Sequence, residues 1–461
     1  MQRSYFDDKK QNTVLVFLVI VSVLIILSLA SDVLLWVLNL DRFSLGLVRI
    51  YFAFTLDSAD SWWPINEAVQ VYAADPEAGI YQTVFFEKKI KFQYPPMSLL
   101  PFVAFEKMGY GFHAVVKLMM LLSFVSIIGI ILSLYRTVVT SCSAIGEGEF
   151  IKGRSMKVAL LAMLIIGTLT FYPVVNGYRL GQVQVFINLA ICLMFMCWLE
   201  NWKLLAGIMV ALAAIVKPQY GLILIWALFR KEKDFLIGML LVLIPTGIAS
   251  LIVFGFQEHL DYLSTLSVMG QHGEVYRSNQ SMNGLLNRLL SGMSTIEFQF
   301  YSFAPYNVIV HAGTLISTIL LLLFGMFYRP GSNKSVSAGE LNLNSALDLA
   351  TMVIIATIVS PIAWSHHYAT FWPILILGFL VAIKIFQKQR NWLSVVNLVL
   401  LSVSYLFVSN YFYWALDDAS VIDPPWNLLQ SYIYFGGLIL LISLTVMRRT
   451  IKTGFANVIS K

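Results

Sequence analysis

The sequence predicts an all-α protein that crosses a membrane ten to twelve times. Hydrophobic residues make up 58% of the chain and charged residues only 12%, whereas soluble domains carry about 25% charged residues. Ten apolar windows approach the ~20 residues that a helix needs to cross a hydrocarbon core about 30 Å thick. Basic residues gather in short segments between the windows. We therefore expect one membrane-embedded unit over residues 1–461.

The first window, 13–38, is interrupted only by Asp32 and is too long for a cleaved signal peptide, so we expect an uncleaved signal anchor. The other clear windows are 113–137, 158–174, 182–200, 235–254, 307–328, 347–363, 368–386, 392–410 and 428–447. Window 204–229 is split by Lys217-Pro218, and proline removes a backbone donor, so we expect two half-helices. Segment 94–105 is short for a crossing and is expected to be a re-entrant segment or a stub.

Lysine and arginine set the expected orientation. With both termini in the cytoplasm, 20 of the 31 basic residues fall on the inner side of the plasma (inner) membrane. The outer side then receives three longer segments, 39–112, 255–306 and 411–427, with 15 of the 25 acids. The basic residues form no single patch, so no nucleic-acid partner is expected.

The first outer segment, 39–112, mixes aromatic side chains with charges, which is typical of amphipathic helices lying in the membrane interface. Asp57 and Asp60 directly follow its apolar start. A carboxylate at this level can act as the general base on a hydroxyl, provided that the site is partly shielded from water. The alternative is that both are solvated interfacial acids.

Two cations lie close to or within apolar windows. Arg179, with Gln182 beside it, stands between two spans and can clamp a phosphate or only snorkel to the interface. Lys217 lies about 20 Å from the cytoplasmic side at 1.5 Å per residue. A lysine at that depth indicates a functional site, and the alternative is a lysine paired with carbonyl groups.

The second outer segment, 255–306, offers amides and one cation, Asn279, Gln280 and Arg288, which suit sugar hydroxyls and a phosphate. Amide-rich loops are also often plain turns. Trp364, His366 and His367 stand between two spans. Adjacent histidines do not fit a metal site with ligands four residues apart, so a phosphate contact or an interfacial position is expected. We expect no metal.

The ordered set of short motifs resembles the PimE-like family of polyprenyl-phosphate-mannose-dependent mannosyltransferases, within the GT-C superfamily. The resemblance rests on Asp60 before an alanine-containing helix, Gly79-Ile80-Tyr81, Tyr94-Pro95-Pro96, Gly181-Gln182-Val183, Ala206-Gly207, Ala213-Ala214-Ile215-Val216-Lys217-Pro218, Asn279-Gln280-Ser281 and Ser360-Pro361 with Trp364-Ser365-His366-His367. Each motif is short, and the order of the set makes it specific.

The resemblance implies transfer of a hexose, with mannose as the expected sugar, from a polyprenyl phosphate to a glycolipid or glycan acceptor at the extracytoplasmic face, with inversion. It implies a base, for which the spacing to Ala68 favours Asp60 over Asp57. The groups expected on the donor phosphate are Lys217, Arg179, Arg288, His366 and His367. The groups expected on substrate are Gln182, Asn279, Gln280, Tyr94 and Trp364.

The resemblance further implies a lipid-linked donor as substrate. We also expect contact with membrane lipids, no separate cofactor, and action as a monomer. The competing hypothesis is a transporter or flippase of a lipid-linked sugar, with Lys217 as a contact at the bilayer midplane. Many transporters are built from repeated halves, and the sequence shows no internal repeat, which weakens that hypothesis.

Overall fold

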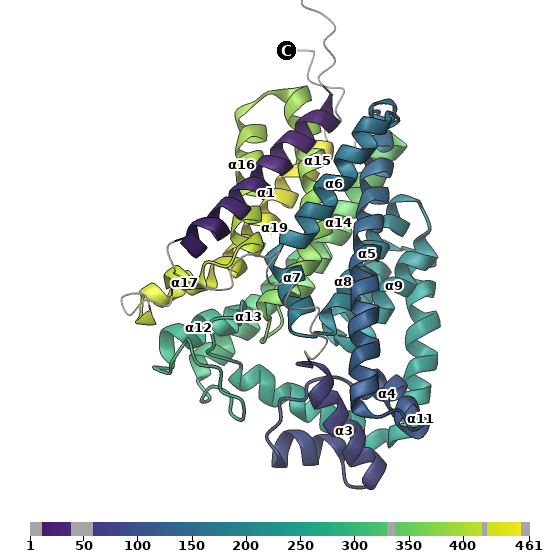
Figure 1. Cartoon of the computed structure of the whole chain (residues 1–461), viewed down its shortest axis with the longest axis vertical. Helices are drawn as coiled ribbons and strands as arrows, with labels where there is room; N and C mark the ends of the chain where they lie inside the picture. Colours follow the sequence, from purple (N-terminus) through teal and green to yellow (C-terminus); the bar gives the residue numbers. More distant parts are fainter. Residues whose placement is uncertain (1–11, 38–58, 330–336, 417–421, 453–461) are drawn as a thin grey trace, which may run out of the picture.

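Figure 1 shows the computed structural model, which describes residues 12–37, 59–329, 337–416 and 422–452. The described residues are helical and form no strand; the backbones of Asn279 and Trp364 pair as one isolated bridge. Eight described helices are long and apolar enough to cross a membrane, or nine if the pair α6 (Arg154–Thr170) and α7 (Tyr172–Arg179), bent by 59°, is one span. The predicted all-α membrane fold is confirmed.

Every clear apolar window coincides with a helix. These helices are α1 (Thr13–Val37), α5 (Phe112–Ala144), α6 with α7, α8 (Gln184–Leu199), α11 (Lys233–His272), α13 (Val308–Phe327), α14 (Ala338–Ile358), α15 (Phe371–Gln389), α16 (Trp392–Ser409) and α19 (Tyr432–Lys452). The span that contains α15 is 89% buried, but those of α11 and α13 are only 17% buried. A helix that is apolar all round needs either protein or lipid on every side, so α15 forms the centre and α11 and α13 face lipid.

The window split by Lys217-Pro218 is a hairpin. Helix α9 (Lys203–Val216) ends where Lys217 becomes extended, and the 3₁₀ turn η4 (Pro218–Gly221) leads into α10 (Leu222–Arg230). Trp198, near the end of α8, has its ring 5.8 Å from that of Trp226 in α10, and Glu232, just after α10, interacts electrostatically with Lys203 at the start of α9. The two arms therefore begin and end at the same level. The predicted break is confirmed, and Lys217 sits at the apex.

Helix α11 packs tightly along the hairpin because of small residues. A Cβ atom added at Gly207 of α9 would lie 2.0 Å from the carbonyl oxygen of Phe235, and one added at Gly238 would lie 2.1 Å from that of Leu204. Only glycine permits this backbone approach. The contact fixes α9, and with it the position of Lys217, against the first turns of α11.

Ion pairs join the segments that carry most of the basic residues, at what we call the basic end of the bundle. The pairs are Arg136–Glu200, Lys384–Glu147, Arg230–Asp348 and Arg448–Asp348. The segments that the sequence analysis assigned to one side of the membrane thus meet in space. Arg230 also donates to the carbonyl oxygen of Met326 at the end of α13 and so ties that helix to α14.

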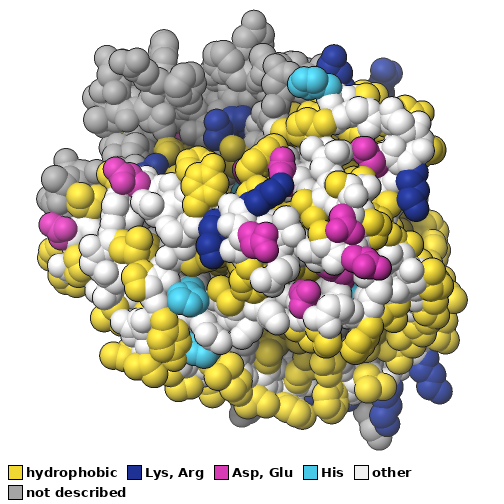
Figure 2. Space-filling model, turned by 90° about the horizontal axis from the view of Figure 1, so that it is seen from below, with side chains coloured by type: hydrophobic (Ala, Val, Ile, Leu, Met, Phe, Trp, Pro, Cys, Tyr) yellow, Lys and Arg dark blue, Asp and Glu magenta, His cyan; other side chains and the backbone are white. Residues whose placement is uncertain are grey.

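The opposite end, the loop end, carries helices formed by the two longer connecting segments. They are α3 (Trp62–Ala74), the π-helix η1 (Gln82–Glu87), the 3₁₀ helix η2 (Pro96–Leu99), α4 (Leu100–Lys107) and α12 (Met282–Leu290), with the last part of α11. Helices α3 and α4 lie at the bottom of Figure 1. Figure 2 shows this end from below, with acidic side chains over the middle of the face and hydrophobic side chains along its border.

Helix α11 continues beyond the predicted end of its span. The apolar window stops at residue 254, and Gly255 adopts a positive φ of 76° there, but helix resumes at once and runs to His272. A glycine can take this conformation without strain, so Gly255 is a kink that joins two helices within α11. The remaining described elements are η3 (Gly148–Ile151), η5 (Ser365–Thr370), α17 (Tyr413–Leu416) and η6 (Trp426–Ser431).

Candidate active site

Asp60 is held against the turn between α7 and α8. The backbone N–H of Asp60 donates to the carbonyl oxygen of Leu180 at 3.1 Å, and that of Ser61 donates to Gly181 at 3.4 Å. The first residues of α3 are therefore fixed to a segment more than a hundred residues further along the chain. This brings together Asp60, Arg179 and Gln182, as the site hypothesis requires.

A directed chain of hydrogen bonds ends on the Asp60 carboxylate. The side-chain amide of Gln182 donates to Asp60, and its oxygen accepts from the Ser61 hydroxyl at 2.7 Å. Because Ser61 has one hydroxyl hydrogen, the Tyr94 hydroxyl, 2.8 Å away, must be the donor to Ser61. The order is Tyr94 to Ser61 to Gln182 to Asp60, which fixes the amide with its nitrogen on the carboxylate.

The carboxyl of Asp60 is accessible yet electrostatically perturbed. Asp60 is an exposed residue, so a substrate can reach its carboxyl group. Partial burial by the surrounding protein raises the pKa of Asp60 above its ordinary value of 3.8. The hydrogen bond from Gln182 and the charge of Arg179 lower that pKa. The net shift is upward, which makes Asp60 a better proton acceptor than an ordinary surface aspartate.

Lys217 is oriented from the same turn. Its ammonium donates to the side-chain oxygen of Gln184 at 2.7 Å, and the Gln184 amide donates in turn to Asn188 at 2.8 Å. Gln182 therefore holds Asp60, and Gln184, two residues later, holds Lys217. Gln184 was not singled out in the sequence. Its signal was there, because Gln184 and Asn188 are polar residues four apart inside an apolar window.

His366 and His367 lie next to Lys217. They belong to η5, their ring centroids are 4.8 Å apart, and both interact electrostatically with the Lys217 charge. Helix α7 packs closely here, since a Cβ at Gly177 would lie 3.7 Å from that of His366. Both rings are buried, and His366 Nε2 and His367 Nδ1 have no hydrogen-bond partner among the described residues. Buried polar atoms without a protein partner are rare in native proteins and are satisfied by a water, an ion or a ligand.

Arg288 lies in a different environment. Its guanidinium is 1% exposed and donates to the carbonyl oxygens of Tyr276 and Asn279, at 3.3 Å and 2.9 Å, and to the Ser431 hydroxyl at 2.5 Å. Burial lowers the pKa of Arg288 to about 10. These contacts tie α12 to the chain that enters α19, and the structure does not bring Arg288 to the Asp60 turn.

The amides of Asn279 and Gln280 are also directed at the protein. Asn279 donates to the carbonyl oxygens of Glu274 and Pro361 and accepts from the N–H of Ala363. Gln280 donates to the Tyr413 hydroxyl and the Gln430 carbonyl oxygen and accepts from the N–H of Tyr434. Both amides therefore shape the loop.

The other predicted site residues are distributed as follows. Trp364 packs its ring against those of Tyr276 and Phe298, at 6.1 Å and 5.6 Å between centroids, on the loop that contains Asn279. Asp57 lies outside the described residues. Within the described ranges, no group of three or more histidine, cysteine or acidic side chains is placed to hold a metal ion.

Fold and site together define a multi-pass membrane protein in which one turn holds an accessible carboxylate through Gln182 and a lysine through Gln184. The chain matches the sequence profile of glycosyltransferase family 87 over residues 92–361, more than half of its length. It belongs to glycosyltransferase family 87, a GT-C-type membrane family, and is a membrane glycosyltransferase. No curated protein matches the chain. The matched range covers α7, α8 and Lys217, whereas Asp60 and the two histidines lie outside it.

Proposed function

We propose that this glycosyltransferase moves a hexose from a polyprenyl phosphate to a hydroxyl group of a glycolipid or glycan. Mannose is the sugar that the sequence resemblance favours. The observation that carries the proposal is the α7–α8 turn, where Gln182 holds the Asp60 carboxylate and Gln184 holds the Lys217 ammonium. A proton acceptor and an anion-binding group are thereby positioned by one short segment.

The proposed reaction is a single displacement with inversion at the anomeric carbon. The acceptor oxygen forms a bond to the anomeric carbon while the bond from that carbon to the phosphate oxygen breaks, and polyprenyl phosphate leaves with the electron pair. Asp60 takes the proton of the acceptor hydroxyl. Lys217, Arg179 and the two histidines stabilise the negative charge that develops on the departing phosphate.

The depth of Lys217 favours a lipid-linked donor. It stands at the apex of the α9–α10 hairpin, after 14 helical residues that rise about 1.5 Å each. A charged group at this depth is unfavourable unless it has a function or a partner. A phosphate on a prenyl chain can reach this level from within the bilayer, whereas a soluble sugar nucleotide would have to leave water.

The proposed orientation places the loop end outside the plasma membrane and both chain termini in the cytoplasm. The support is the basic end, where Arg136, Arg230, Lys384 and Arg448 come together in ion pairs. An excess of basic residues marks the cytoplasmic side of membrane proteins. Asp60 then faces the extracytoplasmic surface, where a glycolipid or cell-envelope glycan is available. We propose that the enzyme works as a monomer without a divalent metal.

The experiment that tests this function is a transfer assay. Purified protein in nanodiscs is incubated with radiolabelled polyprenyl-phosphate mannose and a membrane lipid extract, and labelled glycolipid is measured by thin-layer chromatography. We expect label to move into glycolipid, and Asp60→Asn to lower the rate by about 10²- to 10⁴-fold with an unchanged melting temperature. Asp75→Asn, at an exposed acid at the end of α3, is the matched control and should retain full activity.

Two results would contradict the proposal. Full activity of Asp60→Asn together with loss in Asp57→Asn would move the base to Asp57. Movement of the lipid-linked sugar across proteoliposome membranes without any new glycosidic bond would replace transfer by translocation.

A further inference from the structure

The motif Gly79-Ile80-Tyr81 in the first outer segment is held by the part of α11 that follows the kink. Glu258 of α11 is 5% exposed, and its Oε1 accepts a hydrogen bond from the backbone N–H of Ile80 at 2.9 Å. Gly79 has a positive φ of 74°, and a Cβ atom added there would lie 3.8 Å from the same oxygen. Glycine adopts this φ without strain, so the chain can turn at Gly79 and present the N–H of Ile80 to the carboxylate.

Tyr81, the last residue of the motif, reaches the segment that carries Tyr94. Its side chain is fully buried, and its ring lies 5.4 Å from that of Phe92 and 5.4 Å from that of Tyr262 in α11. The Tyr81 hydroxyl donates to the backbone carbonyl oxygen of Tyr94 at 2.6 Å. Tyr81 therefore fixes the backbone of Tyr94, whose own hydroxyl begins the chain of hydrogen bonds that ends on the Asp60 carboxylate.

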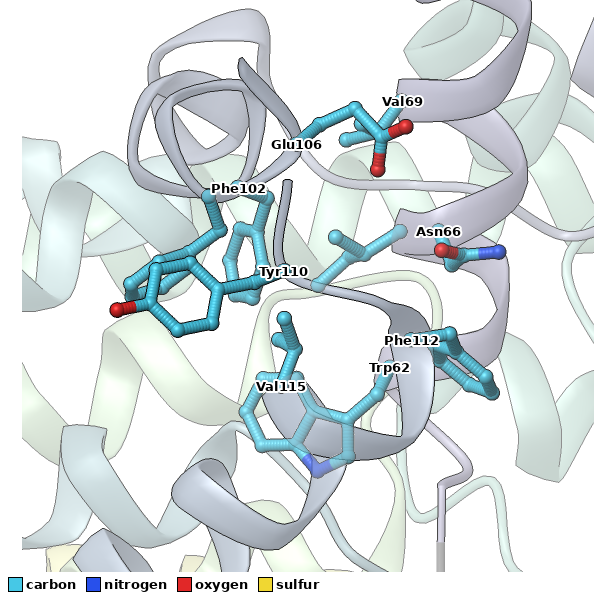
Figure 3. A pocket seen from close by; sticks show the side chains of 10 residues that line it. Trp62, Asn66, Val69, Phe102, Glu106, Tyr110, Phe112 and Val115 are labelled. Carbon is cyan, nitrogen blue, oxygen red and sulfur yellow. The ribbon is translucent and has the colours of Figure 1, made fainter. Parts of the chain in front are cut away.

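The backbone of Asp60 is anchored independently of this motif. It is tied to the α7–α8 turn, and Trp62, two residues later, is 2% exposed with its ring 6.0 Å from Phe102 and 6.0 Å from Phe186. Figure 3 shows Trp62 and Phe102 among the side chains of α3, α4 and α5 that line one small hollow. Loss of the Tyr81 hydroxyl therefore leaves the Asp60 backbone in place and acts on the group that contacts its carboxylate.

We infer that Tyr81 and Glu258 are positioning residues for the proposed base. The Glu258 carboxylate orients the motif, and the Tyr81 hydroxyl sets the position of Tyr94. Through the hydrogen-bond chain, Tyr94 keeps the Gln182 nitrogen directed at Asp60. Hydrogen bonds in such a chain strengthen one another, so displacement of Tyr94 weakens the contact on Asp60. The inference rests on the proposed function, in which Asp60 takes the proton of the acceptor hydroxyl.

The test is the pH profile of kcat/KM for Tyr81→Phe, measured with the full-length protein in nanodiscs by the sugar-transfer assay. The substitution removes one hydroxyl and keeps the ring. We expect kcat to fall by about threefold to tenfold, as for loss of one hydrogen bond, with the KM for the lipid-linked donor unchanged. The acidic limb should move to higher pH, in the direction expected for Gln182→Met and by less.

Tyr72→Phe is the matched control. The Tyr72 hydroxyl also joins the first outer segment to α11, because it donates to the carbonyl oxygen of Val253 at 2.7 Å, but it is not part of the chain to Asp60. We expect Tyr72→Phe to lower the melting temperature about as much as Tyr81→Phe and to leave the pH profile unchanged. Combining Tyr81→Phe with Tyr94→Phe should shift the limb no further than Tyr94→Phe alone, since both interrupt one chain.

Two substitutions of Glu258 separate its position from its charge. Glu258→Gln keeps an oxygen that can accept from the N–H of Ile80, and its amide nitrogen takes the place of Oε2, which has no hydrogen-bond partner among the described residues. Glu258→Met removes the acceptor. We expect Glu258→Met to reproduce the pH profile of Tyr81→Phe and Glu258→Gln to restore a profile close to that of the wild type.

Infrared titration of the carboxyl band that Asp60→Asn removes reads the same effect without turnover. Arg179, the charged group that acts on Asp60 from α7, is unchanged in every variant, so a raised pKa of Asp60 in Tyr81→Phe reports the hydrogen-bond chain. An unchanged band and an unchanged acidic limb, with activity lost only in proportion to unfolded protein, would overturn the positioning role and leave the reaction intact. A raised pKa in protein that never forms a glycosidic bond supports the positioning role and contradicts the reaction.

Discussion

Two polar clusters at the loop side of the bundle use similar residue types for different purposes. The α7–α8 cluster, made of Asp60, Gln182, Gln184, Lys217 and the two histidines, leaves an accessible carboxylate and unpartnered ring nitrogens. The loop cluster, made of Asn279, Gln280 and Arg288, directs its side chains at backbone carbonyls and hydroxyls of the protein. A polar group is available to a substrate only where the fold has not already satisfied it.

The two clusters also differ in what they contribute energetically. The side chains of the loop cluster connect α12 to the chain before α15 and to the chain that enters α19, so they hold together segments far apart in the sequence. The α7–α8 cluster keeps a partly buried lysine near two buried histidines. That arrangement is unfavourable for folding, which supports the proposed role in binding an anion. Substitutions in the two clusters should therefore affect different measurements.

The largest effect is expected from Lys217→Met. Loss of a group that stabilises developing charge lowers the transfer rate by about 10²- to 10³-fold. The melting temperature should stay the same or rise, because methionine removes a buried charge and keeps the length of the side chain. Transfer rate and thermal unfolding are measured on the same preparation.

Lys203→Met is the matched control for Lys217→Met. Lys203 starts the same hairpin at the basic end, where its ammonium lies over the ring of Trp198. We expect its removal to leave the transfer rate within about twofold. A marked drop in melting temperature for Lys217→Met, with activity lost only in proportion to unfolded protein, would identify Lys217 as a structural lysine.

Arg288→Met should act on stability. It leaves the buried Asn279 carbonyl oxygen and the Ser431 hydroxyl without the Arg288 donor, which destabilises the protein by about 3 kcal/mol. The KM for the lipid-linked donor should not change in the protein that remains folded. Arg154→Met, at an exposed arginine of the basic end, is the control and should leave the unfolding transition unchanged. A raised donor KM at an unchanged melting temperature would place Arg288 on the phosphate.

The smallest effect is expected in the pH dependence. The base must be deprotonated, so kcat/KM falls as the pH falls through the pKa of Asp60, which partial burial raises above its ordinary value of 3.8. Gln182→Met removes a hydrogen bond that lowers this pKa, so the acidic limb of the profile should move to higher pH.

Tyr94→Phe provides the graded comparison for the pH experiment. The Tyr94 hydroxyl acts on Asp60 only through Ser61 and Gln182, so its removal should shift the acidic limb in the same direction and by less. Identical profiles for wild type and Gln182→Met would mean that Asp60 is not the group that limits the rate at low pH.

The sequence predicted the spans because lipid demands runs of apolar residues and proline interrupts them, as at Lys217-Pro218. It also placed Asp60, Arg179 and Lys217 among the site candidates. It could not predict which polar groups the fold satisfies, because that depends on distant partners. Asn279 is held by Pro361, 82 residues away, and Gln182 by Ser61, 121 residues away. Spacing along the chain carries no information on such pairs.

The most direct test of the proposed site is a cryo-electron-microscopy structure with a non-transferable polyprenyl-phosphonate mannose bound. The sugar's anomeric carbon should face Asp60, with the phosphonate oxygens within hydrogen-bond distance of Lys217 Nζ and His366 Nε2. A phosphonate bound instead at Arg288 and Asn279, with Asp60 away from the sugar, would contradict it.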